Sequence, residues 1–154
     1  MVAKSFTVAL LVVATFLVGC GDEKDKPFLQ FSGGGFIFNY RLATADYGFV
    51  ARVVKELPEG SVIEATFDNP AGGPPIVIVE KSVSGSKGYM FRTPSLTGIK
   101  ANYPYKVVLR LLAAKEGVEL ARYERTYKSD LDQSVLPDQP LTVGPGYHQP
   151  PNKP

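Results

Sequence analysis

The sequence predicts an all-β protein, folded as an antiparallel β-sandwich, on three observations. From Phe28 onward, apolar residues recur at every second position in several short stretches, which is the periodicity of half-buried strands. Turn-forming stretches rich in Gly, Pro, Asn and Ser separate them about every ten residues, and no long helix fits between. With 154 residues, 44% hydrophobic and 21% charged, the chain is long enough for one ordinary domain and too apolar to be wholly disordered.

The first twenty residues have the order of a secretory signal: positive charge at Lys4, an apolar run, then small residues. The run from Phe6 to Val18 falls within the roughly 7 to 15 residues of a signal-peptide core and is shorter than the about 17 to 25 of a membrane-spanning helix. A buried core helix is the alternative. The order of the three parts favours a signal peptide over residues 1–19.

Leu17-Val18-Gly19-Cys20 resembles the lipobox of bacterial lipoprotein precursors. The resemblance implies cleavage between Gly19 and Cys20, a diacylglyceryl group on the Cys20 sulfur, and an acyl chain such as palmitate on its amino group. Three chains would hold the protein at a membrane permanently, whereas one myristoyl chain binds reversibly. The alternative is that Cys20 is a free core cysteine.

The lipobox resemblance implies a lipid-anchored protein of the cell envelope that faces the periplasm. Gly21 follows Cys20 where the best-studied sorting rule reads Asp as an inner-membrane signal, so the outer membrane is favoured. Asp22 and Glu23 follow at positions that other bacterial lineages can read as a retention signal, so residence in the inner membrane stays an alternative. Residues 20–27 form a short lipidated tether, residues 28–135 the sandwich, and residues 136–154 a proline-rich tail.

Eight strands are expected within the sandwich. Ile76 to Val79 is uninterrupted apolar sequence, which predicts a strand covered on both faces. Leu111 to Arg122 predicts a hairpin around Gly117, with a helix over 109–120 as the alternative. Leu141 to Val143 is a possible short edge strand in the tail. The expected strands lie near residues 28–32, 35–41, 47–55, 61–68, 76–82, 88–93, 103–113 and 118–128.

The stretch from Ile99 to Leu109 resembles the entry to the penultimate strand of fibronectin type III and related immunoglobulin-like domains. The resemblance implies an immunoglobulin-like sandwich in which Tyr105 forms a tyrosine corner, its hydroxyl bonding to upstream backbone. Asn102 departs from the pattern, since glycine is common there. A simple edge strand led by Pro104 is the alternative.

Several residues invite a chemical role. Ser32 to Gly35 has bare backbone that could approach a phosphate, but the Gly-Lys-Ser/Thr ending is missing, so a β-bulge is favoured. His148 is the sole histidine and lies in the tail, where a positioned base is not expected. Asp130, Asp132 and Asp138 could offer oxygen ligands to calcium, but the EF-hand pattern is absent.

Glu64 and Glu80 could form the carboxylate pair of a glycan hydrolase if their strands are neighbours, although solvated strand faces are favoured. Eight tyrosines and nine phenylalanines are enough aromatic residues for a sandwich core. Some of the tyrosines could instead form an exposed contact patch, with Tyr40, Tyr47, Tyr123 and Tyr127 as candidates.

These observations favour a non-catalytic binding or scaffolding module that presents its loops or tail to an unknown envelope protein. One cysteine and one histidine exclude thiolate zinc clusters and multi-histidine sites, so no cofactor and no metal are expected. A net charge of +2 without a block of like charge gives no nucleic-acid footprint. The alternatives are a glycan hydrolase using paired carboxylates and a small-ligand or glycan binder with aromatic loops.

Overall fold

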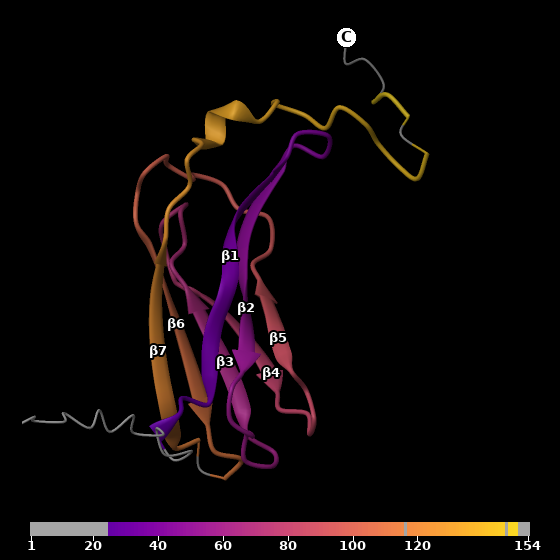
Figure 1. Ribbon diagram of the computed structural model, residues 1–154. Helices are drawn as coiled ribbons and strands as arrows, with labels where there is room; N and C mark the ends of the chain where they lie inside the picture. Colours follow the sequence, from indigo (N-terminus) through magenta and orange to yellow (C-terminus); the bar gives the residue numbers. More distant parts are fainter. Residues whose placement is uncertain (1–24, 116, 147, 151–154) are drawn as a thin grey trace, which may run out of the picture.

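The computed structural model describes residues 25–115, 117–146 and 148–150. It is an antiparallel β-sandwich of two sheets, as expected (Figure 1). One 3-10 helix, η2 (Gln133–Val135), follows the last strand. The strands are β1 (Leu29–Asn39), β2 (Thr44–Val53), β3 (Val62–Phe67), β4 (Ile76–Lys81), β5 (Gly88–Arg92), β6 (Tyr105–Leu112) and β7 (Glu119–Tyr127).

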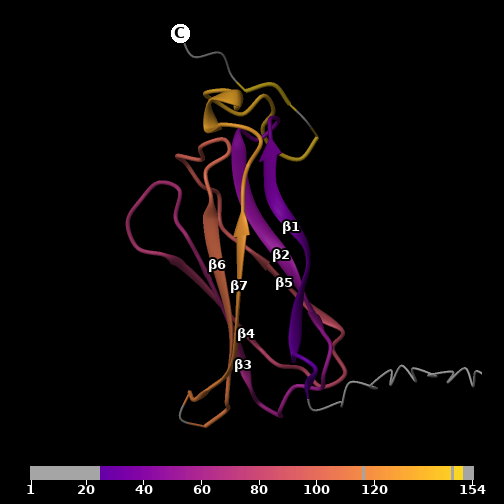
Figure 2. The same cartoon turned by 60° about the vertical axis from the view of Figure 1, so that its left-hand side comes forward.

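The two sheets have the orders β1-β2-β5 and β4-β3-β6-β7, and Figure 2 shows them face to face. In a constant-type immunoglobulin domain, the fourth strand joins the sheet of the first, second and fifth strands. Here β4 pairs with β3 instead. Consequently β4 and β5 are edge strands on one side of the sandwich, and β1 and β7 are edge strands on the other.

A glycine bulge interrupts β1. The register with β2 shifts between Ser32 and Gly35, and the strand then continues to Asn39. A Cβ atom on Gly34 would lie 2.6 Å from the Gly48 carbonyl oxygen and 2.7 Å from the Tyr127 hydroxyl, so only glycine fits. The bulge interpretation is confirmed, and the expectation of two separate strands here was wrong because a bulge bends a strand without ending it.

The expectation that β4 is covered on both faces was also wrong. Val77 and Val79 are 53% and 54% exposed. Their side chains lie on the outer face of the four-stranded sheet, and the neighbouring β3 side chains on that face are only half-buried. A continuous apolar run does not distinguish a covered strand from an apolar edge strand, because both satisfy strand propensity.

The core lies between the sheets, where alternate side chains of both sheets point inward. Phe49 packs against Phe31, Phe67 and Phe91, with ring centroids 4.7, 5.7 and 5.4 Å apart. Tyr47 is fully buried and donates its hydroxyl proton to the Asp68 carbonyl oxygen at 2.7 Å. Burial, followed by the nearby Asp68 charge, raises the pKa of Tyr47, so the phenol stays a donor.

The β6–β7 hairpin forms as expected, and the alternative helix does not. The Ala113 amide donates to the Val118 carbonyl oxygen at 2.8 Å, and Gly117 has a φ of 60°. The short strand expected at Leu141 to Val143 is absent. Val143 makes only an isolated bridge with His148.

Tyr105 is the first residue of β6, and its hydroxyl accepts a hydrogen bond from the Lys100 amide at 2.8 Å. This upstream backbone bond is the contact that defines a tyrosine corner. The ring is buried and contacts Phe36 and Tyr47. The bond therefore holds the β5–β6 connection against the core.

Replacing Tyr105 with phenylalanine is expected to lower the free energy of unfolding by about 1 kcal/mol, because the Lys100 amide loses its acceptor. Denaturant unfolding measures the change. Tyr103→Phe is the matched control, since that ring is half exposed and its hydroxyl has no hydrogen bond within the described part of the chain. Equal losses in both variants would show that the corner bond contributes nothing particular.

Candidate functional site

The two ends of the sandwich carry different segments of the chain (Figure 1). We call the end at which β1 begins the proximal end; the β2–β3, β4–β5 and β6–β7 connections also lie there. The opposite end, the distal end, carries the β1–β2, β3–β4 and β5–β6 connections together with the segment that follows β7. Loops at one end of a rigid sandwich are a common place for binding residues.

The distal end exposes a large share of the apolar side chains that reach solvent. Two of its segments are joined, because the Leu141 amide donates to the Arg41 carbonyl oxygen at 2.8 Å. This bond brings the tail against the β1–β2 turn, which itself exposes Tyr40 and Leu42. The distal apolar residues are Tyr40, Leu42, Tyr103, Leu131, Val135, Leu141 and Val143.

Local hydrogen bonds give these segments a defined shape. The Asn39 Oδ1 atom accepts from the Leu42 amide at 3.1 Å, closing the β1–β2 turn. The Gln133 amide donates to the Ile99 carbonyl oxygen at 2.8 Å, which ties η2 to the β5–β6 connection. A backbone that is already ordered loses little further conformational entropy on binding, so this apolar end suits protein contact.

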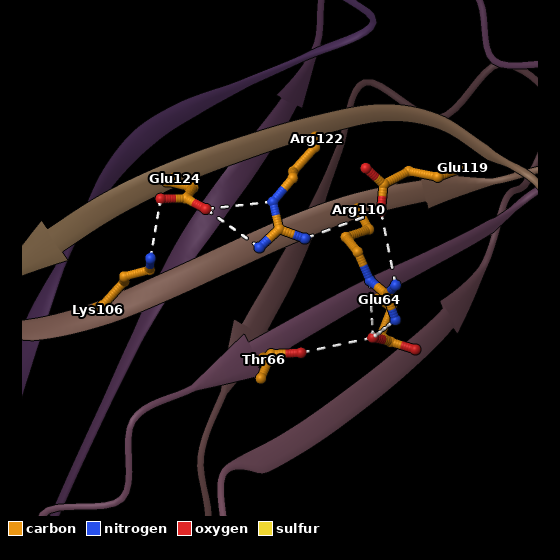
Figure 3. Close-up of polar contacts among 7 residues, drawn as sticks. All are labelled: Glu64, Thr66, Lys106, Arg110, Glu119, Arg122 and Glu124. Atoms are coloured by element: carbon orange, nitrogen blue, oxygen red, sulfur yellow. Dashed lines mark hydrogen bonds and ion pairs between the residues drawn. The ribbon is translucent and has the colours of Figure 1, made fainter.

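The outer face of the four-stranded sheet carries a charged network instead (Figure 3). Arg110 bridges Glu64 at 2.5 Å and Glu119 at 3.6 Å. The remaining ion pairs join Glu119 to Arg122 at 3.8 Å, Arg122 to Glu124 at 3.1 Å and Glu124 to Lys106 at 3.1 Å. The three cations and three carboxylates neutralise one another, so the network offers no net charge to a ligand.

The network predicts a pH dependence. Hydrogen bonds from Lys106 and Arg122 lower the pKa of Glu124 below its ordinary value. Glu124 thus stabilises the fold above its unfolded-state pKa, and that contribution is lost as pH falls through the folded-state pKa. Glu124→Gln should therefore be less stable than the parent at neutral pH, and the difference should vanish in acid.

Denaturant unfolding at neutral and at acid pH measures this dependence. Glu80→Gln is the matched control, because Glu80 is an exposed strand residue without an ion pair in the described part of the chain. A difference between Glu124→Gln and the parent that persists unchanged in acid would contradict the prediction. Raised salt should also shrink the difference, since exposed charges are screened.

The carboxylate pair expected for a glycan hydrolase does not form. The strands of Glu64 and Glu80 are neighbours, but Glu64 lies opposite Val79 and Glu80 lies opposite Ile63. Because side chains alternate along a strand, the two carboxylates point to opposite faces of the sheet. Glu64 is instead bound to Arg110.

The proposed tyrosine patch is also wrong, because three of its four members are held in the fold. Tyr47 and Tyr127 are buried, and the Tyr127 hydroxyl donates to the Gly33 carbonyl oxygen at 3.2 Å. The half-buried Tyr123 accepts a hydrogen bond from the Phe28 amide at 3.0 Å. These two hydroxyls join β7 to β1 across the side of the sandwich. Tyr40 alone is exposed, at the distal end.

The remaining candidates from the sequence are the acidic residues considered for calcium, His148, and the cleavage and lipidation residues. Asp132 caps η2 by accepting from the Ser134 amide at 3.3 Å. Within the described ranges, no group of three acidic, histidine or cysteine side chains could hold a metal ion together. The carbonyl oxygen of His148 accepts from the Val143 amide at 2.8 Å. Gly19 and Cys20 lie outside the described residues, so cleavage and lipidation stay predictions.

Residues 25–115, 117–146 and 148–150 include no helix with the length and hydropathy of a membrane span.

Two hollows lie elsewhere on the sandwich. A polar hollow of about 920 Å³ at the proximal end is lined by residues 53–60 and 82–87. A smaller one of about 350 Å³, called the notch, lies on the outer face of the three-stranded sheet. Gly35 and Gly48 face each other across β1 and β2 at its floor, and Ile37, Val50 and Met90 expose apolar side chains around it.

Sequence reasoning missed most of the distal apolar residues. Leu42 lies in a turn, outside the alternation that marks a strand, and Leu141 was expected in a short edge strand of the tail and not on a contact surface. Apolar residues in turn segments, outside any periodic pattern, were the signal that could have found them. No protein-family model matches the chain, and a search of curated proteins also finds no match.

Proposed function

We propose that the mature chain is a lipid-anchored protein of a bacterial envelope, periplasm-facing and favouring the outer membrane, whose sandwich is a non-catalytic module that binds a protein partner through its distal end. The observation that carries this proposal is the set of exposed apolar residues at the distal end, on segments tied to each other by backbone hydrogen bonds. An apolar surface at loop segments is typical of protein contact sites.

The position of the tether supports a partner-binding surface at the distal end. An anchor on Cys20 would lie just before β1, which begins at the proximal end. Residues 21–27 reach about 25 Å when fully extended, and β1 spans about 36 Å at roughly 3.3 Å per residue. The distal end would therefore stand away from the bilayer, where it can meet a partner in the periplasm.

A photo-crosslinking residue placed at single positions in the lipidated chain tests the binding surface in cells. Leu42 and Leu141 are 42% and 55% exposed, and Val118 in the proximal β6–β7 turn is a matched control at 53%. We expect one discrete crosslinked species from the two distal positions and none from Val118. Leu42→Asp should also weaken the product formed from position 141.

Crosslinks from Val118 equal to those from Leu42 would contradict a distal binding surface. The anchor has its own test: Cys20→Ser should lose incorporation of labelled palmitate and move the protein from the membrane fraction to the soluble fraction. If labelled palmitate never enters the parent protein, the anchor proposal fails, whatever the crosslinks show.

A second candidate function, binding of a small apolar ligand, is favoured by the notch. Its volume of about 350 Å³ lies within the roughly 300 to 1,000 Å³ of ligand pockets. The fluorescence of anilinonaphthalene sulfonate, a probe of apolar sites, should rise in the presence of the protein. Met90→Glu should abolish that rise and Val118→Glu should not. Equal effects of the two substitutions would count against a ligand site in the notch.

A further inference from the structure

The outer edge of β4 has backbone groups that the fold leaves open. The Ser82 amide donates to the Ser61 carbonyl oxygen at 2.8 Å, and hydrogen-bonded pairs alternate along an antiparallel ladder. The register therefore turns the amides of Ile76, Ile78 and Glu80 toward β3, and those of Val77, Val79 and Lys81 away from it. Within the described residues, β4 pairs with β3 alone.

The other three edge strands have features that discourage a further strand. Bulges, short length and charged side chains protect natural edges. The bulge at Ser32 to Gly35 bends β1, β5 has only five residues, and β7 exposes Arg122, Glu124 and Arg125. β4 is only one residue longer than β5 and ends in Glu80 and Lys81, but from Ile76 to Val79 it has no bulge and no charged side chain. An open, apolar edge of this kind is a template for strand addition.

The last two residues of β4 carry opposite charges, which limits the sequences that can pair with its free edge. Glu80 and Lys81 are exposed, and neither belongs to an ion pair in the described part of the chain. As consecutive strand residues they point to opposite faces of the sheet. A strand added to this edge can therefore place a basic residue opposite Glu80 and an acidic residue opposite Lys81, because directly opposed opposite charges stabilise a strand pair.

We propose that the free edge of β4 binds an extended segment of another polypeptide by antiparallel strand addition. The segment reads, from its amino end, acidic, basic, apolar, any residue, apolar. These five residues lie opposite Lys81, Glu80, Val79, Ile78 and Val77 in that order. The two apolar residues cover the exposed Val79 and Val77 side chains, and the backbone groups at 77, 79 and 81 gain partners. This site is distinct from the distal surface and does not depend on it.

A second copy of the chain is a poorer occupant of the same edge. Self-pairing with Val79 on the two-fold axis places Lys81 opposite Val77 and Glu80 opposite Ile78. Moving the axis to residue 80 places two Glu80 carboxylates opposite each other. Moving it to residue 78 places Lys81 opposite Pro75, which has no amide to donate. When two β4 strands are aligned so that their outward backbone groups can bond, neither Glu80 nor Lys81 lies opposite a residue of opposite charge.

The proposal is tested with a capped, fluorescently labelled peptide whose central residues are Glu, Arg, Val, Thr and Val, added to the whole chain in detergent. Anisotropy reports binding, and amide hydrogen exchange reports its location. We expect slower exchange at Val77, Val79 and Lys81. A peptide with the Glu and Arg exchanged should bind about tenfold more weakly, a loss of about 1.4 kcal/mol for two mismatched charges.

Backbone variants distinguish strand addition from simple apolar contact. N-methylation of the first valine, whose amide faces β4, should abolish binding, whereas N-methylation of the threonine, whose amide faces away, should leave it. In the protein, Val79→Pro removes an amide that the fold does not use, and proline is tolerated at such edge positions. Val79→Pro should lose binding by about tenfold or more, and Val79→Thr should keep it.

Three results would overturn the proposal. The first is equal binding of the two N-methylated peptides, which needs no folded variant to interpret. The second is protection of amides outside β4. The third is a dimer of the whole chain that Val79→Pro dissociates, because a second copy would then cover this edge. Loss of the distal crosslinks would leave the β4 result unchanged, so the two proposals fail independently.

Discussion

Replacing Phe49 with alanine is expected to lower the free energy of unfolding by about 3 to 5 kcal/mol, the usual cost of truncating a large aromatic residue in a core. Phe49 is 2% exposed, and its ring packs against Phe31 in β1, Phe91 in β5 and Phe67 in the opposite sheet. Hydrogen-bonded ladders hold β2 on both sides, so its backbone cannot move alone into the space left behind.

Denaturant unfolding measures this loss, provided that the dependence on denaturant is unchanged. Met90→Ala is the matched control, since Met90 lies on the opposite face of the same sheet and is 70% exposed. It should change the free energy of unfolding by no more than about 0.5 kcal/mol. Similar losses in the two variants would mean that Phe49 does not join the two sheets.

Gly48→Ala is expected to lower the free energy of unfolding by about 2 to 3 kcal/mol, because a side chain there meets the backbone of the next strand. Its Cβ atom would lie 2.3 Å from the Phe91 carbonyl oxygen and 2.9 Å from the Arg92 Cα atom. Neither atom can rotate away, so β5 must move from β2.

Hydrogen exchange of the β5 amides should report the same movement in Gly48→Ala as faster exchange. Gly88→Ala is the matched control, since its Cβ would approach the Ala51 carbonyl oxygen only to 3.1 Å. We expect a loss of about 1 kcal/mol or less there. If Gly88→Ala is as destabilising as Gly48→Ala, close strand approach at Gly48 is not the cause.

The fold could be predicted from the sequence because alternation and turn residues act locally. The structure begins and ends most strands within a few residues of the expected positions, as for Ile76–Lys81 and Glu119–Tyr127. The error at Ser32 to Gly35 arose because glycines mark a bulge and a turn alike. Only the register with β2 distinguishes them, and register depends on a distant part of the chain.

The candidate site was harder to predict, because it depends on which face and which end each residue occupies. Glu64 and Glu80 both have even numbers, which alone does not say whether they share a face. Only the observed register, with Glu64 opposite Val79 and Glu80 opposite Ile63, puts them on opposite faces of paired strands. Sequence also could not distinguish the buried Tyr47 from the exposed Tyr40. Tyr47 lies within a strand and points into the core, whereas Tyr40 lies in the turn after β1. Which tyrosine is buried depends on how the two sheets pack, and local sequence does not show that.

The direct run of β1 from the proximal to the distal end has a mechanical consequence. A pull between the amino end of the domain and the β1–β2 turn is carried by the β1 backbone itself. A strand already rises about 3.3 Å per residue, close to the limit of about 3.6 Å for a stretched chain. Outside the glycine bulge at Ser32 to Gly35, such a load can lengthen this path very little, so the domain would transmit tension as a stiff link and not as a spring.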